Sequence, residues 1–309
     1  MTRGRLSPGD AFAGYTVERL LGVGGMSEVY LVEGRETLKI LNSEASQSDR
    51  LRAKFVMEAE IAARLHHPNI VSVHAHGEFD GQLWMSMHYV EGYSAARLVA
   101  RGQIALEVGR AARIVSEVAK GLDYAHSCGV LHRDVKPSNI LISTEARPDG
   151  YEQVLLSDWG IARLLDDETP LASGGTVLAS IQYAAPELLR GERLSPRTDI
   201  YALGATLVEL LTGKPPYPLA TPLAIMDAQL NASPPVVTER RRSLRRGLNA
   251  VVATALAKDP ADRFATSKDL SDAVARALTS PAPRGPETQA PSRRSPFGTG
   301  WRGALRRHR

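Results

Sequence analysis

The sequence predicts an α+β protein of two lobes, with a β-rich N-lobe followed by a helical C-lobe. Up to about residue 90, short runs rich in β-branched and aromatic residues alternate with glycine-rich turns, as strands do. Beyond residue 90, apolar residues recur at spacings of three and four, the period of amphipathic helices. The change of pattern near residues 87–92 places the join between the lobes.

The strands and helices can be assigned in chain order. The N-lobe helix should run from about residue 49 to 65. His67 and Pro68 end it, because a residue before a proline disfavours helical backbone angles. In the N-lobe we expect strands at 15–21, 28–32, 37–41, 70–76 and 83–89. In the C-lobe we expect helices at 108–128, 199–213, 223–230, 244–258 and 267–278.

Length and composition agree with one two-lobed domain and a tail. The chain has 309 residues, of which 43% are hydrophobic and 23% charged, as in ordinary globular proteins. We assign residues 1–14 to an N-terminal extension and residues 15–279 to the domain, divided at residue 90. Residues 280–309 are rich in Pro, Ser, Gly and Arg, the composition of a disordered tail.

The net charge of +4 is concentrated in the tail, where seven arginines accompany one acidic residue. The nearly neutral remainder does not favour nucleic-acid binding. The tail is either a solvated segment or an electrostatic tether to anionic lipid or an acidic partner. The sequence has no signal peptide, no long apolar span and one cysteine, Cys128, so we predict a cytoplasmic protein.

A glycine-rich stretch joins the first two expected strands. Glycine lacks a Cβ, so backbone N–H groups in such a stretch can approach phosphate oxygens. A strand follows the glycines, which argues against a dinucleotide-binding fold, where a helix would follow. The stretch is either a plain hairpin or a phosphate-binding loop, made of Leu21, Gly22, Val23, Gly24, Gly25, Met26, Ser27, Glu28 and Val29.

Lys39 lies inside an apolar strand, where a lysine is either exposed at an edge or buried with a partner. Glu58 lies in the middle of the apolar stripe of the following helix. An unpaired buried carboxylate is costly, so we expect Glu58 to pair with Lys39. The pair would hold the lysine against nucleotide phosphates, although a purely structural ion pair gives the same pattern.

The most specific motif occupies residues 132–139 and reads H-R-D-V-K-P-S-N. Asp134 can orient an incoming hydroxyl group and accept its proton. Lys136 can reach a γ-phosphate and offset the charge that develops there. Asn139 offers a neutral oxygen ligand to Mg²⁺. Chance assembly of these residue types in this order is improbable, so the motif predicts phosphoryl transfer.

A further acidic residue, Asp158, directly follows a strand-like apolar run. A hairpin turned around residues 147–150 precedes that run and places the carboxylate at the end of a strand. There Asp158 would be the main ligand of Mg²⁺ or Mn²⁺.

Together these motifs resemble those of the eukaryotic-like serine/threonine protein kinases, from about residue 15 to 278. Residues 21–30 are most similar to the bacterial branch, particularly actinobacterial receptor-type kinases. The resemblance implies the bilobal protein-kinase fold and ATP-dependent transfer of a γ-phosphoryl group to Ser or Thr of proteins, including the chain's own activation segment. Lys136 stands where serine/threonine-directed members keep a lysine.

The resemblance assigns roles to further residues. Glu187 and Arg263 should form a buried bridge, and Asp199 should cap the backbone of the catalytic loop. Dimerisation through the N-lobe is another family expectation. The expected contacts of ATP in the join between the lobes are the gatekeeper Met87, with Tyr89, Val90 and Leu141.

The chain departs from the family pattern without losing a catalytic group, so we expect an active enzyme. Ser27 replaces the third glycine of the phosphate loop. Thr37 replaces the usual alanine above the adenine, which adds volume and polarity there. Trp159 replaces the usual phenylalanine and should bias the packing switch between active and inactive states. Ala179 and Ser180 replace a glycine and a threonine.

Arg133 directly precedes the catalytic aspartate, and in the resembled family such an arginine pairs with a phosphate on the activation segment. The candidate segment lies between residues 158 and 187. We favour Ser173 and Thr176 as phosphosites because they flank two glycines. A phosphate of about −2 charge would order the segment against Arg133.

Two other functions stay open. A nucleotide-binding scaffold without turnover is disfavoured by the complete set of charged and metal-binding residues. A small-molecule phosphotransferase shares the aspartate and Mg²⁺ chemistry but does not explain Glu187 and Arg263. The basic run at 240–246 is either a solvated loop or a docking site for acidic substrates.

Overall fold

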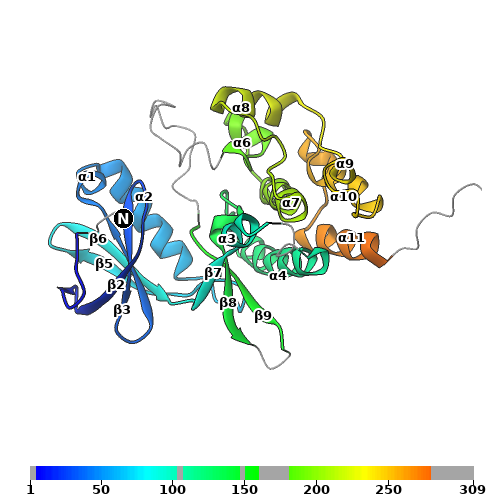
Figure 1. The fold of residues 1–309 in the computed structure, drawn as a ribbon. Coiled ribbons are helices and arrows are strands. Elements are labelled where there is room, and N and C mark those ends of the chain that lie inside the picture. The colour runs from blue at the N-terminus through cyan, green and yellow to red at the C-terminus, as the bar shows by residue number, and fades with distance from the viewer. Residues whose placement is uncertain (1–4, 103–106, 147–149, 160–180, 280–309) are drawn as a thin grey trace, which may run out of the picture.

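A computed structural model describes residues 5–102, 107–146, 150–159 and 181–279. Most of its strands gather in one lobe and most of its helices in the other, side by side (Figure 1). The predicted α+β fold with a β-rich N-lobe and a helical C-lobe is confirmed. The predicted phosphosites Ser173 and Thr176, the departures at Ala179 and Ser180, and the basic tail lie outside the described residues.

The N-lobe is a six-stranded antiparallel sheet with strand order β1-β2-β3-β4-β6-β5. Its strands are β1 (Ala11–Phe12), β2 (Tyr15–Val23), β3 (Ser27–Val32), β4 (Glu36–Leu41), β5 (Val73–Phe79) and β6 (Gln82–His88). Helices α1 (Ser43–Ser46) and α2 (Asp49–Ala62) follow β4. Apolar residues of both helices form one core cluster with Leu41, Leu83 and Met85 of the sheet, which fixes α2 against it.

The segment assigned to an N-terminal extension is tied to the N-lobe. Strand β1 pairs with β2, and Phe12 is buried in a cluster with Tyr30. The ring of Phe12 meets the edge of Phe79 at 5.1 Å between centroids. The Leu6 amide donates a hydrogen bond to the Tyr30 hydroxyl at 3.1 Å. Residues 5–14 therefore complete the outer face of the sheet.

The C-lobe packs its helices around α7, of which almost every residue is buried. Ser195 and Thr198 form a capping box at the start of α7, and Gly213, with φ of 77°, ends it. No helix among the described residues is long and apolar enough to cross a bilayer. The helices are α3 (Ala95–Ala100), α4 (Val108–Ser127), α6 (Pro186–Arg190), α7 (Pro196–Thr212), α8 (Pro222–Asn231), α9 (Val237–Arg240), α10 (Gly247–Ala255) and α11 (Ser267–Thr279).

A small antiparallel sheet of the C-lobe has the order β7-β8-β9, with β7 (Gly92–Ser94), β8 (Ile140–Ala146) and β9 (Glu152–Leu156). A 3₁₀ turn at Pro137–Asn139 leads into β8, and another lies at Pro260–Asp262. The predicted hairpin between β8 and β9 is confirmed. Ile140 pairs with Leu156, so Asn139 and Asp158 project from adjacent strand ends.

The expected strands and long helices are present with shifted ends. Strand β5 begins at Val73 rather than at residue 70. The reason is that Ile70 and Val71 bond elsewhere: the Val71 amide donates to the Leu156 carbonyl at 3.0 Å. This bridge joins the region after α2 to β9 and so links the two lobes.

Candidate active site

A cleft of about 460 Å³ lies between the lobes. Its volume is within the range of small-molecule sites. The sequence-predicted residues that line it are Leu21, Val29, Thr37, Lys39, Met87, Tyr89, Val90, Leu141 and Asp158.

Residues 22–28 form the hairpin between β2 and β3, which is closed by a hydrogen bond from the Gly24 amide to the Ser27 carbonyl at 2.8 Å. Asn42 steadies that hairpin from the end of β4, donating to the carbonyl of Gly25 at 3.2 Å.

The join between the lobes requires a glycine. A Cβ at Gly92 would lie 1.9 Å from the carbonyl oxygen of Ile142, which no side chain tolerates. The close approach lets β7 pair with β8 directly beneath the cleft. It thereby sets Leu141, on β8, as the floor of the cleft.

Lys39 lies between two carboxylates. Its Nζ is 3.1 Å from Glu58 Oε1 and 2.9 Å from Asp158 Oδ1. Burial alone would lower the pKa of Lys39, but the two carboxylates outweigh it and raise that pKa. Lys39 in turn holds the pKa of Asp158 below its usual range, against the effect of burial. The predicted pair is present, and Asp158 joins it, so a charged ammonium is fixed at the inner end of the cleft.

Asp134 is fixed by its own loop. Lys136 Nζ lies 2.7 Å from Asp134 Oδ2. The Asn139 amide nitrogen donates to the backbone carbonyl of Asp134 at 2.9 Å and to its Oδ2 at 3.1 Å. That orientation turns the Asn139 oxygen away from Asp134. One side chain thus orients the carboxylate with its nitrogen, while its oxygen accepts from the Ser138 hydroxyl at 3.3 Å.

The backbone of the catalytic loop is capped by Asp199, as predicted. Its two carboxylate oxygens accept from the amides of His132 at 2.8 Å and Arg133 at 2.7 Å. Arg133 has φ of 66°, a conformation that a non-glycine residue adopts only when its surroundings hold it. His126 donates to the same Asp199 carboxylate at 2.8 Å. Asp199 therefore stabilises the strained turn that directly precedes Asp134.

His132 is a structural residue of the loop rather than a proton carrier. It is fully buried, and its Nδ1 accepts from the Asp134 amide at 3.2 Å while its Nε2 lies 3.1 Å from the Ser157 carbonyl. Burial lowers the pKa of His132, which keeps the ring neutral. Trp159 packs beside it with ring centroids 4.8 Å apart. The ring pair supports the segment that carries Asp158.

The Glu187–Arg263 bridge has the predicted contacts. Two guanidinium nitrogens of Arg263 lie 2.7 and 2.8 Å from the two Glu187 oxygens, and both residues are buried. Thr198 adds a hydroxyl bond to Glu187 at 2.8 Å. Such a bidentate pair fixes geometry as well as charge. It anchors the start of α6 against α7.

The basic run at 240–246 contributes to structure. Arg240 donates to the carbonyls of Pro215 at 2.9 Å and Pro216 at 2.5 Å. Arg241 donates to the Leu211 carbonyl in the last turn of α7 at 3.1 Å. Both arginines satisfy backbone carbonyls, so the run is more than a solvated loop.

Sequence reasoning missed part of the cleft wall. The overlooked lining residues are Arg19, Val71, Gly92, Arg97, Ser138 and Ser157. Arg19 precedes Leu21 by two positions, and alternate residues of a strand share a face, so it could have been found from the sequence. Arg97 could not, because its position depends on how α3 packs beneath the cleft.

Most of the chain matches a known protein family. A model of the protein kinase domain matches residues 15–274. This chain belongs to the protein kinase family. The match covers both lobes and every residue placed in the cleft above.

Relatives come from mycobacteria. The serine/threonine-protein kinase PknJ of Mycobacterium tuberculosis is 46% identical over 295 residues, covering 93% of this chain and 49% of PknJ. PknF of the same species is 43% identical and covers 88% of this chain and 58% of PknF. The chain thus spans about half the length of these relatives. The kinase is of the actinobacterial, eukaryotic-like serine/threonine class, as predicted.

Solved structures agree with the fold. The crystal structure of the M. tuberculosis PknI kinase domain superimposes with a TM-score of 0.71 at 39% identity. The alignment covers 88% of this kinase and 99% of that chain. Protein kinases use ATP and a divalent metal in general, which agrees with the chemistry of the cleft.

Proposed function

We propose that this kinase domain transfers the γ-phosphoryl group of ATP to serine and threonine hydroxyls of proteins, with Asp134 as the base. The single observation that carries the proposal is the juxtaposition of two sets of groups. The Lys39–Glu58–Asp158 cluster and the fixed Asp134–Lys136–Asn139 loop come together across neighbouring strand ends.

Each residue has a task that its position supports. Lys39, charged and held at two points, would bind the inner phosphates. Asp134 would orient the acceptor hydroxyl and take its proton, and Asn139 keeps its carboxylate in place. Lys136 would stabilise the negative charge that grows on the transferring group. Most of the rate enhancement would come from this positioning and charge stabilisation, since phosphoryl transfer needs little covalent help from the protein.

The metal-binding residues fit a hard cation. The Asn139 oxygen and the Asp158 carboxylate are oxygen donors at adjacent strand ends, next to the lysine that would bind phosphate. Mg²⁺ characteristically takes one or two protein oxygens and completes its shell with phosphate oxygens and water. When bound, Mg²⁺ or Mn²⁺ would neutralise phosphate charge. Asp158 is suited to that site because Lys39 keeps its pKa low and hence its carboxylate ionised.

Activation by phosphorylation belongs to the same proposal. The Nε of Arg133 is buried and has no hydrogen-bond partner among the described residues. A phosphate on Ser173 or Thr176 would supply oxygen acceptors for this guanidinium. N-lobe dimerisation and tethering through the tail stay predictions that the proposed reaction does not require.

The test is incubation of the purified chain with labelled ATP and Mg²⁺, beside the Asp134→Asn variant, followed by phosphosite mapping. We expect label on serine or threonine of the wild type alone, with Ser173 or Thr176 among the sites. Absence of label in both, while ATP still raises the melting temperature, would favour a nucleotide-binding scaffold. Wild type that is fully active without phosphate between residues 158 and 187 would contradict the activation step.

A further inference from the structure

One buried polar side chain of the C-lobe is not explained by the chemistry above. Gln229, on α8, is fully buried. Its amide nitrogen donates to the carbonyls of Ile181 at 3.2 Å and Gln182 at 2.6 Å. Its oxygen accepts from the Tyr201 hydroxyl, on α7, at 2.5 Å. Both polar ends of the amide are therefore used, one on α7 and one on the segment before α6.

That segment, residues 181–185, which we call the docking segment, also contacts α7. Its Tyr183 hydroxyl donates to Glu209 of α7. Burial raises the pKa of Tyr183, and the Glu209 carboxylate that accepts its hydroxyl bond adds to that shift. The segment runs directly into Glu187, whose bridge to Arg263 anchors its far end. Its backbone is thus held at one end by the ion pair and at the other by Gln229.

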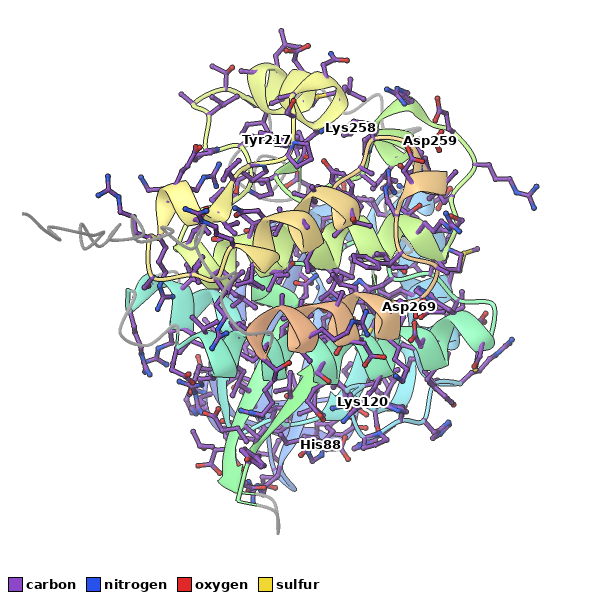
Figure 2. All side chains as sticks on the ribbon, turned by 90° about the vertical axis from the view of Figure 1, so that its right-hand side faces the viewer. His88, Lys120, Tyr217, Lys258, Asp259 and Asp269 are labelled. Atoms are coloured by element: carbon purple, nitrogen blue, oxygen red, sulfur yellow. The ribbon has the colours of Figure 1, made fainter. Side chains whose placement is uncertain are left out.

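Lys258 holds Gln229 from the opposite side. Its Nζ is 2.7 Å from the Gln229 carbonyl and 3.2 Å from that of Ala228, both in the last turn of α8. Carbonyls in the last turn of a helix lack partners in the next turn, so a cation there is favourable. The Tyr217 hydroxyl lies 3.0 Å from the same Nζ, and Figure 2 shows these two labelled side chains together near α8.

We propose that Gln229 is a positioning residue that fixes the docking segment for a protein substrate, with Lys258 fixing the turn of α8 from which Gln229 projects. The inference rests on the proposed function, because it concerns how a protein substrate is seated. An apolar side chain would fill this interior at less cost, since a buried amide is tolerated only when hydrogen-bonded. Here the amide donates to two carbonyls at the turn that leads into α6, so it specifies where that turn lies.

The decisive variant is Gln229→Glu, tested in the full chain with dephosphorylated casein as the acceptor. The two side chains have nearly the same shape, and the glutamate can still accept from Tyr201. It has no N–H to give to Ile181 and Gln182 once ionised. We expect KM for casein to rise about 10- to 100-fold, because the variant loses the hydrogen bonds to both carbonyls. KM for ATP should stay within about twofold of wild type, since the cleft does not contact α8.

Two further variants and a control distinguish a loss of positioning from a general loss of stability. Gln229→Met replaces the amide by an apolar side chain of similar size, and Lys258→Met removes the support of α8. Both should raise KM for casein in the same direction. The matched control is Gln82→Glu in the N-lobe, where a buried amide also donates to a backbone carbonyl, that of Leu41 at 3.1 Å. It should lower the melting temperature without changing KM for casein.

Hydrogen exchange separates this inference from the proposed function. If the wild type fails to phosphorylate casein, the proposed function fails, but amide exchange over residues 181–185 still reports positioning. Faster exchange there in Gln229→Glu and Gln229→Met, and not in Gln82→Glu, is expected in either case. Unchanged exchange would overturn the inference. So would a KM for casein that stays within about twofold of wild type in both Gln229 variants.

Discussion

At the scale of single residues, the cleft is organised by one lysine shared between two acids. Glu58 and Asp158 both approach Lys39 Nζ within 3.1 Å. Burial raises the pKa of Glu58, and Lys39 opposes that shift. Removal of the lysine would leave two carboxylates facing each other, and repulsion between like charges then raises the pKa of at least one of them.

Lys39→Met should therefore lower kcat/KM about 10²- to 10³-fold, the usual effect of deleting a charge-stabilising donor. The measurement is phosphoryl transfer from labelled ATP at saturating acceptor. Lys268→Met, at an exposed ion pair of α11 with Asp272, is the control and should retain wild-type kinetics. Retention of more than a tenth of the activity in Lys39→Met would contradict the role of Lys39.

Trp159 offers a second residue-scale test. It is 2% exposed, and its indole N–H has no hydrogen-bond partner among the described residues. An unsatisfied buried donor costs about 1–3 kcal/mol. A smaller aromatic ring removes that cost but loses a packing free energy of similar size. Trp159→Phe should thus stay within about 1 kcal/mol of the wild-type stability, and Trp159→Ala should lose about 3–5 kcal/mol. Urea unfolding measures both, and a large loss in Trp159→Phe would show that the indole nitrogen is satisfied.

At the scale of elements, the sequence predicted long periodic segments well and short ones poorly. The helix expected at 108–128 is α4, Val108–Ser127. It could be predicted because apolar residues at helical spacing over many turns are a strong sequence signal. Strand β1 and helix α6 were not predicted, since two to five residues carry no period. Phe12 is buried only because it packs against residues of the sheet that are distant in sequence, such as Tyr30 and Leu38. The Lys39–Glu58 pair could be predicted because a charge on a buried face demands a partner. The Glu187–Arg263 bridge was expected from the family resemblance, whereas Gln229 left no such signal.

The Glu187–Arg263 bridge predicts a pH-dependent stability. Burial raises the pKa of Glu187, but the bonds from Arg263 and Thr198 outweigh it and hold that pKa below its usual 4.5. The stabilisation is therefore present above about pH 4.5 and is lost as the pH falls through the folded-state value. Glu187→Gln should cost about 3–5 kcal/mol at pH 7, because it leaves Arg263 buried without its anion.

Unfolding in urea at pH 7 and at pH 4 checks this expectation. The difference between wild type and Glu187→Gln should shrink at the lower pH, since below the usual pKa of 4.5 the carboxylate of the unfolded state takes up a proton and the folded state loses part of its advantage. A difference that is the same at both values would mean that the bridge stabilises through shape alone. Asp269→Asn, at the exposed start of α11, serves as a control for the substitution of an acid by its amide.

At the scale of the whole molecule, the two lobes are joined at the surface as well as through the cleft. Arg35, in the turn between β3 and β4, contacts Glu91 at 2.9 Å and Glu145 of β8 at 2.6 Å. Its backbone carbonyl also accepts from the Tyr89 amide at 3.2 Å. The N-lobe thus has an ionic contact with the base of the cleft on the outer side of the join.

The exposure of these side chains decides how much that contact matters. All three are about 60% exposed, and exposed ion pairs contribute little because water screens them. Arg35→Ala should therefore change KM for ATP by no more than about threefold. The change should disappear when both proteins are assayed at about 1 M salt, where the screening length is about 3 Å. A larger effect that persists in salt would contradict a screened ionic contact, whereas Arg35→Lys, which keeps the charge, should behave as wild type in either condition.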